Sequence, residues 1–319
     1  MKKIAVLTSG GDAPGMNVAI RAIVRSAIHY GMEAYGVQDG FKGLSENDIF
    51  PLTRKHVTRI INRGGTILGS ARYPEFKEEK TQLIAVENLK KRDIEGLIVI
   101  GGDGSFRGAQ ALSKLGIRTI GLPATIDNDI ASTDYSIGFF TALDTAVESI
   151  DKLRDTSFSH QRCSVVEVMG RHCGDLGLYA GIAVGSEFIV TPETGFDKSK
   201  TIAEVKKSFD RNKRHAIVVV TENMTDVHQL AKDIEKATTH ETRATVLGHV
   251  QRGGTPQAFD RVLATEMAER AVYLLSKSLG DKVIGLNRKD LEEFSFEEAL
   301  SMKRETPSKR YGLVGQLKN

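Results

Sequence analysis

The sequence has little of what marks secreted, zinc-stabilised or membrane-spanning proteins. Its 319 residues include two cysteines, Cys163 and Cys173, and no CxxC pair, so neither a disulfide framework nor a structural zinc site is expected. No apolar run approaches the length that crosses a bilayer, and the N-terminus lacks the pattern of a signal peptide. The formal net charge is +3, with acidic and basic residues interspersed, which gives no nucleic-acid footprint. We therefore expect a soluble, cytoplasmic protein that binds neither a membrane nor a nucleic acid.

The chain alternates apolar strand-like runs, polar or glycine-rich loops and amphipathic helical segments. Residues 3–9 predict a buried strand, residues 10–15 a glycine-rich turn and residues 16–30 a helix. The second half repeats this order, with loops that carry arginine, histidine and glutamate. A short helix is also expected over residues 57–62. Alternation of this kind is typical of parallel, doubly wound sheets.

The fold class that we predict is α/β, with two doubly wound, mostly parallel-sheet, three-layer domains and the active site in the cleft between them. A larger domain, for a metal-bound polyphosphate, is expected at residues 1–138, completed by part of 252–319. A smaller domain, for a phosphorylated and hydroxylated ligand, is expected at residues 139–251. No low-complexity linker separates the two.

Two consecutive strand-like runs each end in a polar loop, the first in GGDGS and the second in TIDND. Glycines let a backbone approach a ligand closely, and amides at the start of the following helix favour an anion. Asp103, Asp127 and Asp129 supply hard oxygen donors of the kind that suit magnesium, which usually takes one or two carboxylates plus phosphate oxygens. The stretch therefore favours a magnesium–nucleotide phosphoryl-transfer site.

Each loop taken alone has a simpler interpretation. GGDG is also compatible with a turn, and IDND with a helix cap. A dinucleotide-binding fingerprint fits poorly, because Gly102, Gly104 and Gly108 are spaced GxGxxxG and not GxGxxG.

Several motifs in order and in register resemble the bacterial 6-phosphofructokinase family. They are TSGGDAPGMN (8–17), GGDGS (101–105), TIDND (125–129), MGR (169–171), GHVQRGG (248–254) and DRVLA (260–264). The similarity runs from residue 1 to about residue 290, and the tail beyond it is weakly informative. The resemblance implies transfer of a phosphoryl group from ATP to the C1 hydroxyl of fructose 6-phosphate, which gives fructose 1,6-bisphosphate and ADP in the committed step of glycolysis.

On the donor side, the resemblance implies a set that binds ATP with its magnesium: Gly11, Arg72, Gly102, Asp103, Gly104, Ser105 and Gly108. It implies Asp103 and Asp129 as the metal ligands. Asp127 resembles the general base that takes the proton from the sugar hydroxyl, with Thr125 beside it. Arg171 and Arg72 resemble the cations that stabilise charge on the moving phosphoryl group, and Gly11 belongs to the same catalytic set.

On the acceptor side, the matched residues are Thr125, Asp127, Asp129, Arg162, Met169, Gly170, Arg171, Glu222, Arg243, His249 and Arg252. Arginine suits a phosphate because its planar fork donates two hydrogen bonds at once. Arg162 and Arg243 resemble the pair that a neighbouring subunit lends, which implies a homotetramer.

A third set resembles the effector site between subunits of this family: Arg21, Arg25, Arg54, Arg154, Glu187, Arg211 and Lys213. In the family, ADP activates and phosphoenolpyruvate inhibits there. Taken alone, Arg21 and Arg25 would be a solvated helix face.

The chain departs from the family at a few positions. Ala124 stands where ATP-using members normally have glycine, whereas pyrophosphate-using relatives carry an acid at position 104 and a lysine at position 124. Small residues at both positions favour ATP here. Phe140 replaces an aspartate and Asn223 a glycine. Three alternatives stay open: a pyrophosphate-dependent phosphofructokinase, a nucleotide- or phosphometabolite-binding regulatory protein that has lost catalysis, and a lipid or NAD kinase with a similar GGDG loop.

Overall fold

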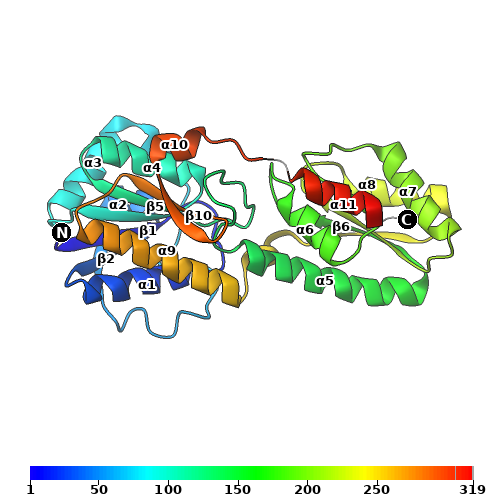
Figure 1. The fold of residues 1–319 in the computed structure, drawn as a ribbon, viewed down its shortest axis with the longest axis horizontal. Coiled ribbons are helices and arrows are strands. Elements are labelled where there is room, and N and C mark those ends of the chain that lie inside the picture. The colour runs from blue at the N-terminus through cyan, green and yellow to red at the C-terminus, as the bar shows by residue number, and fades with distance from the viewer. Residues whose placement is uncertain (306, 318–319) are drawn as a thin grey trace. The chain divides into compact units, whose positions relative to one another are not determined.

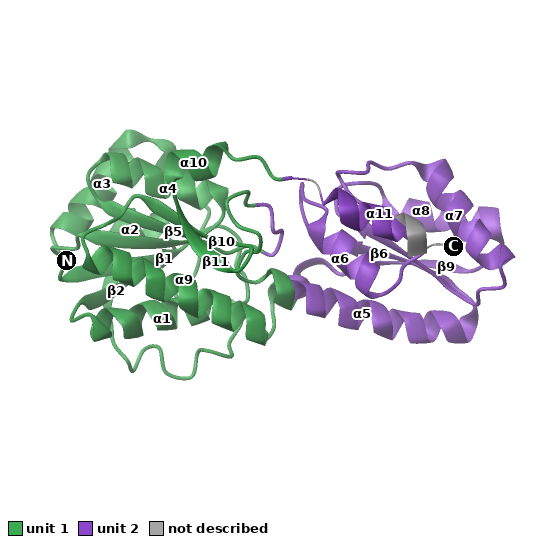
Figure 2. Cartoon of the chain, in the orientation of Figure 1, with its two compact units in different colours: residues 1–125, 130–141, 252–304 green, residues 126–129, 142–251, 305–319 purple. Residues whose placement is uncertain are grey.

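The computed structural model describes residues 1–305 and 307–317 of the chain. It divides into two compact units, coloured separately in Figure 2. Unit 1 contains residues 1–125, 130–141 and 252–304; unit 2 contains residues 126–129 and 142–251 and the C-terminal segment from 305. Across the described part of the chain, no helix combines the length and apolarity needed to cross a membrane.

Unit 1 is built on a seven-stranded sheet in the order β11-β10-β5-β4-β1-β2-β3. All neighbouring strands are parallel except the two outermost pairs, β2–β3 and β10–β11, which are antiparallel. The strands are β1 (Lys3–Thr8), β2 (Glu33–Val37), β3 (Ile49–Leu52), β4 (Gly96–Gly101), β5 (Arg118–Pro123), β10 (Lys282–Asn287) and β11 (Asp290–Ser295).

Helices cover both faces of this sheet, which makes unit 1 a three-layer structure (Figure 1). Helices α1 and α9 pack against each other on one face, and α2, α3, α4 and α10 form the layer on the other. The helices are α1 (Met16–His29), α2 (Phe41–Glu46), the 3₁₀ helix η1 (Pro74–Lys77), α3 (Glu79–Lys90), α4 (Asp103–Lys114), α9 (Ala258–Ser276) and α10 (Phe296–Ser301). Every residue of β4 is buried, as expected for a parallel strand covered on both sides.

Unit 2 is built on a parallel four-stranded sheet in the order β7-β8-β6-β9. Its strands are β6 (Cys163–Val168), β7 (Phe188–Val190), β8 (Ala216–Thr221) and β9 (Thr242–Val246), and its helices are α6 (Asp175–Ala183), α7 (Lys198–Asp210), α8 (Val227–Thr238) and α11 (Ser308–Leu317). Helix α5 (Phe139–His160) begins in unit 1 and runs through unit 2 from residue 142, and the short η2 (Gly248–Arg252) follows β9. Strand β9 lies at the edge of this sheet.

The predicted α/β fold class is confirmed, with a mixed seven-stranded sheet and a parallel four-stranded one. The helix expected over residues 57–62 is wrong. That segment forms successive turns in which the His56 amide donates to the Thr53 carbonyl oxygen and the Thr58 amide to that of Lys55. Arg59 has a φ of 60°, a left-handed conformation that interrupts a right-handed helix. The assignment of a ligand to each predicted domain stays a prediction.

Candidate active site

Three loops leave the same edge of the unit 1 sheet, because β1, β4 and β5 are parallel neighbours. The loops are held to one another by backbone hydrogen bonds. The amide of Ser9 donates to the Ile100 carbonyl oxygen at 3.0 Å, and the amide of Ala124 donates to that of Gly101, also at 3.0 Å. The carboxyl ends of parallel strands are where ligands bind in open α/β sheets. The structure thus brings together the glycine turn after β1, the GGDGS loop after β4 and the start of the TIDND loop.

Two glycines in these loops lie in close contact with other groups. A Cβ at Gly101 would collide with the Ser9 carbonyl oxygen and the Ser105 hydroxyl. A Cβ at Gly11 would collide with the guanidinium of Arg252, which donates from Nη1 to the Asp12 carbonyl oxygen at 3.3 Å. Arg252 was predicted on the acceptor side from its motif alone, and it lies in unit 1 against the first glycine turn.

Helix α4 begins in the GGDGS loop. Asp103 is its first residue and is exposed, while Ser105 is buried. The position of a Cβ at Gly104 has no atom within 4 Å, whereas a Cβ at Gly108 would collide with the ring of Phe41. Gly108 therefore lets α4 pack against that ring, and the helix N-terminus next to Gly104 faces open space. Arg72 is exposed on the loop before η1.

The rest of the TIDND loop belongs to unit 2 and is anchored by the start of α6. The side-chain amide of Asn128 donates to the Asp175 carboxylate at 2.9 Å, and the Asn128 carbonyl oxygen accepts from the thiol of Cys173 at 3.7 Å. Asn128 takes a left-handed φ of 53°, which asparagine tolerates better than most residues. Asp127, on one side of this anchor, is 6% exposed, and Asp129, on the other, is partly buried. The contacts of Asn128 with Asp175 and Cys173 therefore fix the loop that carries Asp127 and Asp129, the two candidate site carboxylates.

The MGR loop after β6 is shaped by carboxylates that bind its backbone. The amides of Gly170 and Arg171 both donate to Oε1 of Glu222, at 3.2 and 2.9 Å. The amide of Gly174 donates to Oε1 of Glu193 at 2.8 Å. Arg171 has a left-handed φ of 56° and an exposed side chain. Glu222, which the resemblance places on the acceptor side, fixes the backbone that presents Arg171.

Three residues of this unit were missed by sequence reasoning. Gln251 is buried and accepts from the amide of Met169 at 3.3 Å; it stands inside the GHVQRGG motif, which was the available signal. Asp175 and Glu193 gave no local signal, because their partners are 47 and 19 residues away in the chain. Glu193 also accepts from the hydroxyl of Tyr311 on α11 at 3.0 Å, so the weakly informative tail reaches this network.

The two arginines predicted to come from a neighbouring subunit lie together on the β6–β9 side of unit 2. Ser164 is the register partner of Arg243, which places Arg162 nearby. Arg162 is partly buried and Arg243 is exposed, and both bind the carboxylate of Glu241. His249 is exposed on η2.

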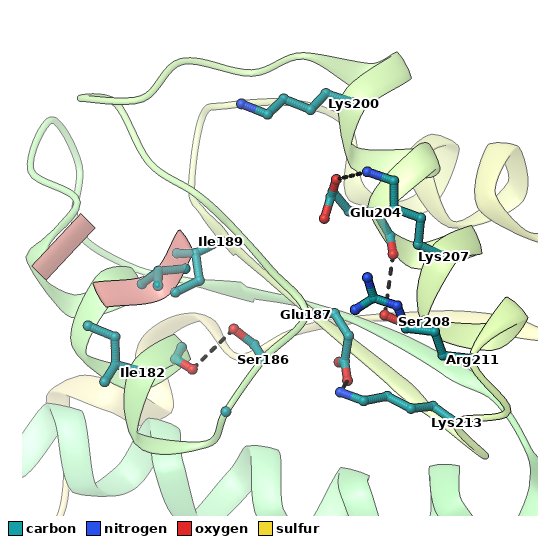
Figure 3. A pocket seen from close by; sticks show the side chains of 13 residues that line it. Ile182, Ser186, Glu187, Ile189, Lys200, Glu204, Lys207, Ser208, Arg211 and Lys213 are labelled. Atoms are coloured by element: carbon teal, nitrogen blue, oxygen red, sulfur yellow. Dashed lines mark hydrogen bonds and ion pairs between the residues drawn. The ribbon is translucent and has the colours of Figure 1, made fainter. Parts of the chain in front are cut away.

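Part of the predicted effector set lines a cavity of about 390 Å³ in unit 2 (Figure 3). Glu187, Arg211 and Lys213 are on its wall with Lys200 and Lys207 of α7. Lys213 pairs with Oε1 of Glu187 at 3.1 Å, and Oε2 of Glu187 accepts from the amide of Ile217. Among the residues that the structure describes, the cavity wall therefore has four cationic side chains and two carboxylates, Glu187 paired with Lys213 and Glu204 paired with Lys207 at 2.8 Å.

The other predicted effector residues are not on this wall. Arg154 donates to the Val184 carbonyl oxygen in unit 2. Arg21, Arg25 and Arg54 belong to unit 1. Burial, and then the charge of Arg25, lowers the pKa of Arg21.

Among the described residues, no three histidine, cysteine, aspartate or glutamate side chains gather as a metal cluster. A magnesium ion bound with a nucleotide needs only one or two carboxylates, since phosphate oxygens and water complete its shell. Asp103 and Asp129 have the hard oxygen chemistry for that task, and neither is fully buried. Each of these carboxylates, by its chemistry and accessibility, fits magnesium carried by a polyphosphate.

The chain is similar to known proteins over nearly its whole length. The phosphofructokinase family pattern matches residues 3–275. The ATP-dependent 6-phosphofructokinase of Photobacterium profundum is 55% identical over 318 residues, 99% of each chain, and that of Vibrio vulnificus is 57% identical over 305 residues, 95% of each chain. The solved phosphofructokinase of Saccharomyces cerevisiae aligns with a TM-score of 0.85 at 34% identity; it covers 100% of this chain, which spans about half (47%) of the yeast chain.

These similarities extend over the glycine turn, the two strand-end loops and the second sheet alike. They confirm the resemblance that the motifs carry and the prediction of a phosphotransferase. The chain belongs to the phosphofructokinase family.

Proposed function

We propose that this enzyme is an ATP-dependent 6-phosphofructokinase, which converts fructose 6-phosphate and ATP to fructose 1,6-bisphosphate and ADP in glycolysis. The observation that carries the proposal is identity above 50% over nearly the whole length to relatives of that name. As in those relatives' family, we place the enzyme in the cytoplasm, as a homotetramer.

In the proposed reaction, the C1 hydroxyl oxygen of the sugar forms a bond to the γ-phosphorus of ATP. The bond between that phosphorus and the β–γ bridging oxygen breaks, ADP leaves, and the hydroxyl proton passes to the carboxylate of Asp127. Asp127 suits this task because its loop is anchored through Asn128 to Asp175. Arg171 and Arg72 would stabilise charge on the moving phosphoryl group, since their side chains are exposed and not used in the core.

Magnesium, held by Asp103 and Asp129, would neutralise phosphate charge when bound with the nucleotide. The backbone amides at the start of α4 and the turn at Gly11 would bind the phosphates. Gly102, Gly104, Ser105 and Gly108 complete this proposed donor side. ATP is favoured over pyrophosphate because neither position fills the space that the rest of the nucleotide needs. The space next to Gly104 is open, and Ala124 is small and buried in unit 1, 1% exposed.

On the acceptor side, we propose that Thr125, Asp129, Met169, Gly170, Glu222, His249 and Arg252 bind the sugar with Arg162 and Arg243. The last two would reach a neighbouring copy, because Arg243 is exposed on the edge strand β9.

Replacing Arg243 with alanine tests the acceptor assignment. We expect the KM for fructose 6-phosphate to rise about tenfold or more, because a bidentate guanidinium–phosphate pair is among the stronger polar interactions. The KM for ATP should change less than about twofold, since the nucleotide is assigned to other residues. Steady-state kinetics with each substrate varied in turn measures both constants. An equal rise in both would contradict the division into donor and acceptor sides.

We also propose that the cavity in Figure 3 binds phosphorylated effectors, ADP as activator and phosphoenolpyruvate as inhibitor. Its support is the pairing of Lys213 with Glu187 and the position of Arg211 on the same wall. Arg21, Arg25, Arg54 and Arg154 would complete the site in the assembled enzyme.

Replacing Arg211 and Lys213 together with alanine should weaken phosphoenolpyruvate inhibition about tenfold, because two cations that bind the anion are lost. The basal rate should stay near that of the unaltered enzyme. Lys206 and Lys232 are exposed and lie off the cavity wall, so their double alanine variant is the control for charge alone. Unchanged inhibition in the Arg211–Lys213 variant would count against this site.

A further inference from the structure

One carboxylate joins the two arginines that are assigned to the sugar phosphate. The Nε of Arg162 donates to Oε2 of Glu241 at 2.6 Å. The Nε of Arg243 donates to the other oxygen, Oε1, at 2.8 Å, and Nη2 of Arg243 lies 2.5 Å from the same oxygen. Each oxygen of Glu241 thus binds a different guanidinium group.

The strand register places these three side chains together. Cys163 pairs with Thr242 in the parallel ladder of β6 and β9, and its amide donates to the Glu241 carbonyl oxygen at 2.9 Å. Arg162 therefore stands beside Glu241 across the ladder. Arg243 is two residues after Glu241, and side chains two apart on a strand lie on the same face. The backbone of the edge strand fixes the order Arg162, Glu241, Arg243.

Electrostatics favours an ionised carboxylate between the two cations. The hydrogen bonds from Arg162 and then from Arg243 lower the pKa of Glu241. Two guanidinium groups side by side repel each other, and the carboxylate offsets that repulsion. The trio keeps a net charge of +1. Each guanidinium has five N–H donors, and the contacts with Glu241 use Nε of Arg162 and the Nε–Nη2 side of Arg243.

We propose that Glu241 is a positioning residue that holds Arg162 and Arg243 together, so that both can bind one phosphate group of the sugar. The inference rests on the proposed function, in which these arginines bind fructose 6-phosphate. The carboxylate binds Nε of Arg162 and the Nε–Nη2 side of Arg243, and the remaining N–H donors of the two guanidinium groups can bind the phosphate. Affinity for the sugar phosphate then depends on a residue that does not itself bind it.

The test compares Glu241→Ala and Glu241→Gln in the full-length enzyme, with fructose 6-phosphate as the probe. Glu241→Ala should raise the KM for fructose 6-phosphate about tenfold, with kcat and the KM for ATP nearly unchanged, because charge-assisted hydrogen bonds that orient both arginines are lost. Glu241→Gln keeps the size and one acceptor oxygen and should give a smaller rise, about threefold. It also serves as the readout if the alanine variant does not fold.

Two further variants separate position from general charge. Glu235→Gln removes a nearby carboxylate that accepts from the Thr242 amide at 3.3 Å, and should leave the KM for fructose 6-phosphate unchanged. In the Arg243→Ala background, Glu241→Ala should raise the KM for fructose 6-phosphate by less than about threefold further, because the effects of mutations at residues in contact are not additive. A purely structural role for Glu241 would instead lower kcat, or raise the KM equally in both backgrounds.

The outcomes distinguish the inference from the proposed function. If Arg243→Ala does not raise the KM for fructose 6-phosphate, the acceptor assignment itself fails. If it does, but Glu241→Ala leaves that KM unchanged or lowers it, only the positioning role is overturned; a lower KM would show that Glu241 competes with the phosphate.

Discussion

Asp127→Ser is expected to lower kcat by about a thousandfold, because a positioned general base contributes roughly 10²–10⁴ in rate. A serine cannot take the proton of the C1 hydroxyl at neutral pH. The KM values for both substrates should change only a few-fold, since the neighbouring Asn128 still binds Asp175 and keeps the loop in place. A coupled assay for ADP release measures kcat and both KM values.

Two comparisons sharpen this prediction. Asp127→Asn keeps the shape of the side chain without its basicity and should be nearly as inactive as Asp127→Ser. Asp210→Ser, which replaces an exposed carboxylate at the end of α7, should retain full activity. Turnover by Asp127→Ser within about tenfold of the unaltered enzyme would show that another group accepts the proton.

Asp260→Ala is expected to cause the largest loss of stability, about 3 kcal/mol or more in the free energy of unfolding, because each buried donor left unsatisfied costs about 1–3 kcal/mol. Asp260 is 0% exposed in the first turn of α9. Its carboxylate accepts from the amide of Gly138 at 2.9 Å, the amide of Thr141 at 2.8 Å and the hydroxyl of Thr141 at 2.6 Å. It therefore binds the start of α5 to α9 within unit 1.

Urea unfolding followed by circular dichroism measures this effect. Thr141→Val removes one donor with little change in volume and should cost less than Asp260→Ala. Asp290→Ala changes an exposed carboxylate on β11 and should alter stability by about 0.5 kcal/mol or less. A loss below about 1 kcal/mol for Asp260→Ala would mean that water replaces the carboxylate at these donors.

Local pattern was sufficient to predict the strand at residues 3–9 and the two strands that end in the GGDGS and TIDND loops, whereas β3, β10 and β11 were not predicted. An unbroken apolar run such as Leu97–Ile100 can only be a covered parallel strand in this context, and β4 is fully buried. In the GGDGS loop, close approach of other groups excludes a side chain at Gly101, whereas a Cβ at Gly102 or Gly104 would have no atom within 4 Å. The apolar pattern of a strand depends on residues close together in the sequence, whereas the crowding at Gly101 also comes from Ser9.

Contacts between distant segments could not be predicted in the same way. Nothing near Gly11 in the sequence indicates that Arg252 lies against it, and nothing near Arg162 indicates that Glu241, 79 residues away, binds it. The helix predicted at residues 57–62 is wrong for a related reason. Arg59 takes a left-handed backbone conformation, although it is not one of the residue types, such as glycine, that typically mark such a conformation in a sequence. Such features follow from tertiary packing and strand register.

A turnover assay with fructose 6-phosphate and magnesium, supplied with either ATP or pyrophosphate, tests the central claim most directly. We expect fructose 1,6-bisphosphate to form with ATP and not with pyrophosphate, because Gly104 and Ala124 are both small and the start of α4 is open. Turnover with pyrophosphate would contradict the assigned donor. No turnover with either donor, despite measurable nucleotide binding, would contradict catalysis itself and favour a regulatory protein.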